Sequence, residues 1–135
     1  MEPKAALNQK VVLIEDDEYM ARIYERAFVF AGYEVEVLSD GEQALAVVPT
    51  INPLPAAIIL DIAIPKIGGY DVLLALRQNP RFGMVPIVVL TNSFLETEKD
   101  RFAAAGADAY LIKIENQTKD VVDKVASVIS SMRHS

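Results

Sequence analysis

The sequence predicts an α/β fold in which a parallel sheet is covered by helices on both faces. Short apolar runs rich in β-branched residues alternate along the chain with segments in which apolar residues follow helical spacing. This alternation is typical of parallel sheets with right-handed crossovers. The 135 residues, of which 52% are hydrophobic, suffice for one domain with a complete core.

The first half of the chain is expected to contain two strand–helix pairs. Lys10–Ile14 is a β-branched run suited to a buried strand, and apolar residues follow helical spacing over 18–31. Tyr33–Leu38 alternates apolar and acidic residues, which indicates a strand with one more exposed face. A short helix capped by Ser39 or Asp40 follows.

The second half continues the same alternation. Three prolines between Pro49 and Pro55 exclude a helix there and predict a loop before the strand Ala57–Leu60. A helix over Tyr70–Gln78 follows an irregular turn and ends at Asn79 because Pro80 comes next. The last elements are a strand over 86–90, a helix over 95–105, a strand over 109–112 and a helix over 117–132.

Strand order does not follow from one sequence, but five strands alternating with five helices favour the flavodoxin-like (βα)5 order 2-1-3-4-5. We expect residues 1–9 to form a polar N-terminal arm, residues 10–132 to form one domain, and residues 133–135 to form a tail.

Composition narrows the function classes. The net charge of −6 argues against direct nucleic-acid binding, which rewards a basic face. The lack of cysteine excludes disulfides and thiolate zinc sites. No apolar run approaches the ~20 residues of a membrane span, and Met1–Lys4 does not open a signal peptide, so a cytoplasmic protein without membrane insertion is expected.

Polar residues follow four of the apolar strands where each strand ends. Glu15 and Asp16 follow the first, Asp61 follows the third, and Thr91 and Lys113 end the last two. The carboxyl ends of parallel strands share one edge, at which ligands bind. Carboxylates, a hydroxyl and an ammonium gathered there suit a divalent cation with a phosphoryl group, and a carboxylate can act as the nucleophile.

These residues carry a resemblance to a known family. The chain resembles the receiver domain of two-component response regulators, of the single-domain chemotaxis type, from about Lys10 to Met132. The resemblance rests on the ordered set Ile14-Glu15-Asp16-Asp17, Leu60-Asp61-Ile62-Ala63-Ile64-Pro65, Val89-Leu90-Thr91, Gly106-Ala107 and Lys113.

The resemblance implies a Mg²⁺ or Mn²⁺ site. Glu15 and Asp16 would be the acidic pair, with Asp16 as the direct ligand and Asp17 as an acid beyond the pair. Asp61 would be both a ligand and the phosphoacceptor, and Ala63 would contribute its backbone carbonyl.

The resemblance also implies a switch. Thr91 and Lys113 would contact the phosphoryl group, and Tyr110 would turn inward when the Thr91 hydroxyl turns towards it. The chain would not be a conventional enzyme but would catalyse its own aspartyl phosphorylation and dephosphorylation. The donor would be a sensor histidine kinase or a histidine phosphotransfer protein. A downstream protein would dock on the face formed by 95–105, Tyr110–Lys113 and the closing helix, and a homodimer is possible.

Two other functions stay open at this point. One is a protein-interaction module that works without phosphorylation, and the other is an unrelated flavodoxin-like binder of small molecules. The absence of a glycine-rich phosphate loop argues against a nucleotide-binding enzyme on this fold.

The chain departs from the family pattern at three places. Ile114 follows Lys113 where proline is usual; a cis bond before isoleucine would cost ~3 kcal/mol, so a trans loop is expected, and the aim of Lys113 stays open. Asn92 stands where a smaller residue is commoner and could crowd the site entrance or donate an extra hydrogen bond. The pair Gly68-Gly69 is expected to loosen the turn after Pro65.

Four basic residues are expected on solvated helix ends: Arg77, Arg81, Lys99 and Arg101.

Overall fold

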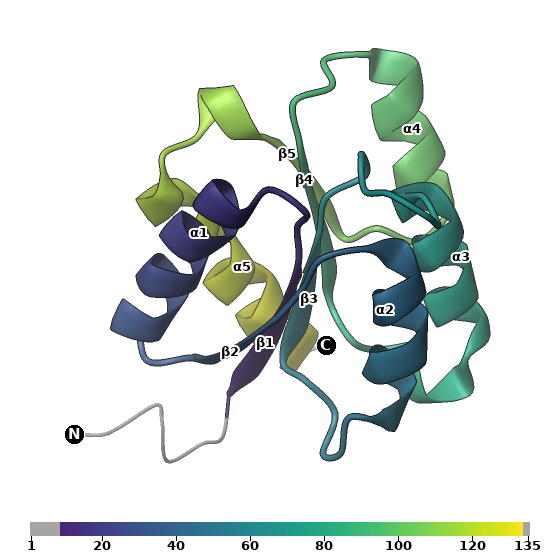
Figure 1. Cartoon of the computed structure of the whole chain (residues 1–135), viewed down its shortest axis with the longest axis horizontal. Helices are drawn as coiled ribbons and strands as arrows, with labels where there is room; N and C mark the ends of the chain where they lie inside the picture. Colours follow the sequence, from purple (N-terminus) through teal and green to yellow (C-terminus); the bar gives the residue numbers. More distant parts are fainter. Residues whose placement is uncertain (1–8, 134–135) are drawn as a thin grey trace.

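The computed structural model describes residues 9–133. Residues 1–8 of the expected arm and residues 134–135 of the expected tail lie outside the described part. Strands and helices alternate along the described chain (Figure 1). None of the helices in this part is long and apolar enough to cross a membrane.

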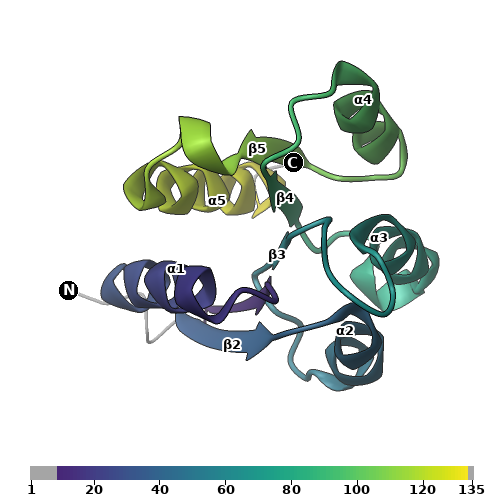
Figure 2. The ribbon, with the colours of Figure 1, turned by 45° about the horizontal axis from the view of Figure 1, so that its top comes forward.

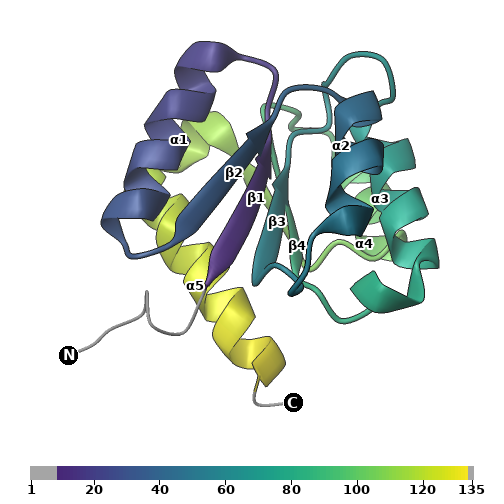
Figure 3. The same ribbon diagram turned by 60° about the horizontal axis from the view of Figure 1, so that its bottom comes forward.

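Five parallel strands form one sheet in the predicted order β2-β1-β3-β4-β5, and Figure 3 labels the neighbouring strands β2, β1, β3 and β4. Their bounds are Lys10–Ile14 for β1, Glu34–Leu38 for β2, Ala57–Leu60 for β3, Ile87–Thr91 for β4 and Ala109–Ile112 for β5. The register pairs Ile14 with Leu60 and Thr91 with Ile112. The carboxyl ends of neighbouring strands therefore lie together at one edge of the sheet.

Helices cover both faces of the sheet, so the molecule has three layers (Figure 2). One face packs against α1 and α5, and the other against α2, α3 and α4. The bounds are Glu18–Phe30 for α1, Gly41–Val47 for α2, Gly69–Gln78 for α3, Glu96–Ala104 for α4 and Thr118–Arg133 for α5.

Burial follows the predicted strand patterns. Every residue of β3 and β4 is buried, as continuous apolar runs in parallel strands require. The strand β2 lies at the sheet edge, and its alternating residues are mostly half-buried. Gln9, expected in the polar arm, is buried, and its carbonyl accepts a hydrogen bond from Glu34 N at 3.0 Å.

The sequence predicted a loop from Pro49 to Pro55, and this prediction was wrong for its first residues. Val48–Thr50 forms one 3₁₀ turn, and Pro49 is its second residue. Proline is tolerated there because the first N–H groups of a helical turn have no partner within it. A second such turn, Pro80–Phe82, begins after Asn79, whose side chain accepts from Arg81 N at 3.0 Å.

The prediction that Arg77 is solvated was also wrong. Its guanidinium donates to the carbonyl oxygens of Phe82 (2.6 Å), Val85 (2.9 Å) and Gly106 (2.9 Å), and to Asp108 Oδ2 (2.9 Å). These acceptors belong to two loops, and the planar fork of arginine can reach both at once.

Arg81, also expected in solvent, donates to the carbonyls of Pro49 and Ile51 at 2.7 and 2.9 Å. Arg101 lies with its guanidinium carbon 3.6 Å from the ring centroid of Tyr70. Both are exposed overall but have specific partners.

Candidate functional site

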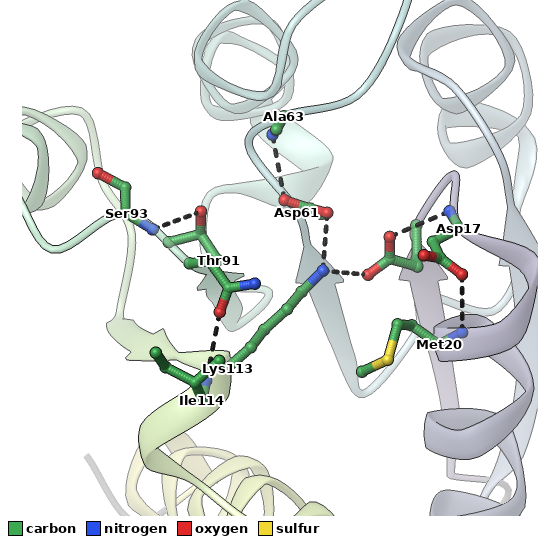
Figure 4. Close-up of polar contacts among 10 residues, drawn as sticks. Asp17, Met20, Asp61, Ala63, Thr91, Ser93, Lys113 and Ile114 are labelled. Atoms are coloured by element: carbon green, nitrogen blue, oxygen red, sulfur yellow. Dashed lines mark hydrogen bonds and ion pairs between the residues drawn. The ribbon is translucent and has the colours of Figure 1, made fainter.

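Three predicted site residues, Glu15, Asp61 and Lys113, meet at the carboxyl ends of the strands, where Figure 4 labels Asp61 and Lys113. The Lys113 ammonium, which follows β5, lies 2.6 Å from Glu15 Oε1 after β1 and 2.9 Å from Asp61 Oδ2 after β3. These groups are 98 and 52 residues away in the chain. The sequence left open where the Lys113 side chain points. The structure shows that it points towards the carboxylates of Glu15 and Asp61.

The two carboxylates that contact Lys113 are largely shielded from water. Glu15 is only 2% exposed and Asp61 6% exposed. Burial raises the pKa of Glu15 and the Asp61 charge adds to this, against hydrogen bonds from Lys113 and from Asp17 N that lower it. Burial lowers the pKa of Lys113, but its hydrogen bonds to the two carboxylates outweigh burial and leave that pKa raised.

Asp61 is held by the turn that follows β3. Its Oδ1 accepts a hydrogen bond from Ala63 N at 3.1 Å. Gly69 N donates to the carbonyl of Ile62 at 3.1 Å and closes the turn. A Cβ on Gly69 would lie 2.5 Å from Ile62 Cα, so this turn is tightly packed where the glycine pair was expected to loosen it.

The residue before that glycine has no such role. A Cβ on Gly68 would meet nothing within 4 Å. The left-handed position of the turn is instead Lys66, with a φ of 71°.

Thr91 is buried at the end of β4, the strand between β3, which Asp61 follows, and β5, which Lys113 follows. Its hydroxyl oxygen accepts from Ser93 N at 3.3 Å. The Tyr110 hydroxyl in turn donates to the Ser93 carbonyl at 3.3 Å, and the Tyr110 ring packs on Phe102 of α4 with centroids 6.1 Å apart. One short segment, the loop after Thr91, therefore contacts both residues of the expected switch.

Asp17 has a structural role that the sequence analysis missed. It is the N-cap of α1, and its side chain accepts from Met20 N at 3.1 Å (Figure 4). The position of an aspartate just before the helical pattern could have revealed this. Glu15 and Asp16 therefore remain as the acidic pair.

The two unusual residues beside Lys113 contact each other. The peptide bond between Lys113 and Ile114 is trans, as expected. Ile114 N donates to Asn92 Oδ1 at 3.3 Å, so the Asn92 side chain accepts a hydrogen bond in this contact.

The acidic group fits a divalent metal ion. Glu15, Asp16 and Asp61 each offer a carboxylate oxygen, and these oxygens all lie within 4.8 Å of one another. Opposite ligands of an octahedral Mg²⁺ ion stand roughly 4 Å apart, and Mg²⁺ prefers one or two carboxylates with waters and phosphate oxygens. Asp16 is exposed and has room for such waters. Ala63 contacts Asp61 through its amide, while its carbonyl remains a predicted ligand.

Comparison with known proteins gives a consistent family. The model of the response regulator receiver domain matches residues 11–126. The alkaline phosphatase synthesis transcriptional regulatory protein PhoP of Bacillus subtilis is 35% identical over 107 residues, which cover 79% of this chain and 43% of PhoP. The chain spans about half or less of the length of the curated relatives it matches first.

Solved structures agree in fold. The chemotaxis response regulator CheY4 of Vibrio cholerae is 27% identical with a TM-score of 0.81, covering 89% of this chain and 98% of that one. The receiver domain of the sensor histidine kinase PA1611 from Pseudomonas aeruginosa is 25% identical with a TM-score of 0.81, covering 91% and 98%. That structure has a magnesium ion coordinated in its active site cleft.

Proposed function

This chain belongs to the response regulator receiver domain family of two-component signalling, and from that membership we propose that Asp61 accepts a phosphoryl group in a Mg²⁺-dependent reaction. The observation that carries the proposal is the ion-pair cluster: one ammonium lies within 2.9 Å of two buried carboxylates from different strands. Such a cluster is costly to bury for structural purposes alone. The same groups are those that phosphoryl transfer to a carboxylate requires.

We propose that Glu15, Asp16 and Asp61 hold the metal ion, with the Ala63 carbonyl as a further ligand. When bound, Mg²⁺ (or Mn²⁺) neutralises negative charge on the carboxylates and on phosphoryl oxygens. Like charges held close raise one another's pKa, so the cation also keeps the acidic group ionised.

In the proposed reaction an Asp61 carboxylate oxygen attacks phosphorus and forms an O–P bond. The P–N bond of a phosphohistidine donor breaks, and the imidazole nitrogen leaves with the electron pair. The Lys113 ammonium, 2.9 Å from Asp61, would shift to a phosphoryl oxygen, and the Thr91 hydroxyl would donate to another. Hydrolysis of the acyl phosphate by water would return Asp61 to its free state.

The donor is proposed to be a sensor histidine kinase or a histidine phosphotransfer protein, acting on a receiver unit of residues 10–132. The readout is proposed to pass through the loop after Thr91, because Ser93 contacts both Thr91 and Tyr110. If the Thr91 hydroxyl turned to the phosphoryl group, it would no longer accept from Ser93 N. Ser93 could then shift, and Tyr110, whose hydroxyl donates to the Ser93 carbonyl, would be free to move. The face formed by α4, β5 and α5 would then change for a downstream partner.

Intact-mass measurement with phosphoramidate or acetyl phosphate tests this proposal. With Mg²⁺ the protein should gain the mass of one phosphoryl group, and Asp61→Asn should gain none. Asp71→Asn is the matched control, because Asp71 is an exposed acid on α3. A gain that persists in Asp61→Asn would show that the nucleophile is another residue. If no donor gave a gain, a phosphorylation-independent interaction module would be the better account.

A further inference from the structure

Asn92 and Ile114 join the ends of two neighbouring strands just beyond their last paired residues. The ladder between β4 and β5 ends with the pair Thr91 and Ile112. One residue past Thr91, Asn92 Oδ1 accepts from the backbone N–H of Ile114, at 3.3 Å. Lys113 lies between Ile112, which is paired with Thr91 in the sheet, and Ile114, whose N–H donates to Asn92.

The contact satisfies a donor that would otherwise have no partner within its own turn. Lys113–Glu115 is a 3₁₀ turn, and Ile112, which precedes it, provides no side-chain cap. The first N–H groups of a helical turn need an acceptor from outside it. Asn92 supplies that acceptor from the neighbouring strand, so it acts as a remote cap.

The contact also explains why proline is unsuited to position 114 in this chain. The second position of a 3₁₀ turn tolerates a proline ring, as Pro49 shows in Val48–Thr50. Proline at position 114 would, however, lack the N–H that donates to Asn92 Oδ1. The two departures from the family pattern, Asn92 and Ile114, are thus two halves of one contact.

We propose that Asn92 is a positioning residue for Lys113, acting through the Ile114 N–H. The Lys113 side chain is 11% exposed, and its ammonium reaches Glu15 and Asp61 from a backbone held just past the carboxyl end of β5. Loss of the hydrogen bond from Ile114 N would leave the turn unanchored on the C-terminal side of Lys113. On the N-terminal side, Asn116 Nδ2 would still donate to the Ile112 carbonyl at 2.9 Å. The kinetic part of this inference rests on the proposed function, in which Lys113 contacts the phosphoryl group.

The first test is amide hydrogen exchange at position 114 in Asn92→Ala. One neutral hydrogen bond at the surface corresponds to about a three- to tenfold effect on an equilibrium. Exchange at position 114 should therefore rise about three- to tenfold. The ¹³Cε–¹H signal of Lys113 should shift, because its ion pairs weaken. This readout does not depend on phosphorylation.

The second test is the rate of phosphorylation by phosphoramidate. Asn92→Ala should slow it about three- to tenfold in the wild-type background and less than about twofold in a Lys113→Ala background. A residue that merely stabilised the loop would slow both backgrounds alike.

Two controls match the chemistry of the change. Ile114→Ala keeps the backbone N–H and removes only an exposed side chain, so the contact should survive. Asn79→Ala removes a comparable cap from the 3₁₀ turn Pro80–Phe82, which precedes β4 and so lies at the opposite edge of the sheet. Neither should change phosphorylation by more than about twofold.

The inference fails if exchange at position 114 and the Lys113 signal stay unchanged in Asn92→Ala, or if the rate falls equally with and without Lys113. If the wild-type chain takes up no phosphoryl group, the proposed function fails. The exchange rate and the Lys113 signal then still decide whether Asn92 positions Lys113.

Discussion

Replacing Arg77 with methionine should be among the most damaging single changes outside the site. The guanidinium donates four hydrogen bonds of 2.6–2.9 Å, three to backbone carbonyls and one to Asp108. Asp108 Oδ2 also accepts from Ile87 N at 2.9 Å, at the start of β4. The one side chain therefore links the end of α3 to the segments that precede β4 and β5.

The expected loss of stability depends on whether the four acceptors, once Arg77 is removed, can bond to water instead. A hydrogen bond to a charged donor is worth about 1.5–3 kcal/mol, but the four are not additive because they share one donor group. The Arg77 side chain is 16% exposed, so water can reach some of the carbonyls after the change. We expect Arg77→Met to lower the free energy of unfolding by about 3–5 kcal/mol. That is a large part of the ~5–15 kcal/mol typical of a domain.

Urea unfolding, followed by circular dichroism with the slope fitted, measures this loss. Arg77→Lys should fall between the wild type and Arg77→Met, because an ammonium keeps the charge but not the planar fork. Arg101→Met is the control: that side chain is 51% exposed, has one ion pair at 3.3 Å and stacks on Tyr70. Its loss should be about 0.5–1.5 kcal/mol. A loss below about 1 kcal/mol for Arg77→Met, or one equal to that of the control, would refute the reasoning.

Three further changes test other parts of the account. Mg²⁺ at 100 times its dissociation constant should stabilise the wild type by about 2.7 kcal/mol in thermal unfolding, and an equal rise in Asp16→Ala would exclude Asp16 as a ligand. Gly69→Ala should cost about 1–3 kcal/mol because its Cβ would press on the Ile62 backbone, whereas Gly68→Ala should stay within about 0.5 kcal/mol; equal losses would contradict the packing of this turn. Burial raises the pKa of Tyr24 above 10, so its phenol contributes stability that is complete below pH 10 and is lost as pH rises through the folded-state pKa. Tyr24→Phe should therefore lose stability less steeply above pH 10, and identical slopes in pH-dependent unfolding would contradict this.

The fold was predictable because each of its elements has a local pattern. Continuous apolar runs such as Ala57–Leu60 became strands buried on both faces. Helix positions Val72, Leu73 and Leu76, spaced for one face, are all buried. The 3₁₀ turn at Val48–Thr50 was missed because proline excludes only the interior of a helix and not its first turn.

The site was predictable as a set of residues but not as a set of contacts. The shared edge of a parallel sheet was enough to bring Asp61, Lys113 and Glu15 together. The partners of Arg77 could not be inferred, because three of them are backbone carbonyls that carry no sequence pattern. The bond between Asn92 and Ile114 was likewise invisible, since it depends on how two loops leave neighbouring strands.

The most direct test of the central claim is a crystal structure of the protein with Mg²⁺ and beryllofluoride, a phosphoryl mimic. The account predicts beryllium bound to an Asp61 carboxylate oxygen and the metal held by the neighbouring carboxylates. Lys113 should have left Glu15 for a fluorine atom, and the Thr91 hydroxyl should donate to another. Beryllofluoride bound elsewhere, or Lys113 still bridging Glu15 and Asp61 beside an occupied site, would contradict the account.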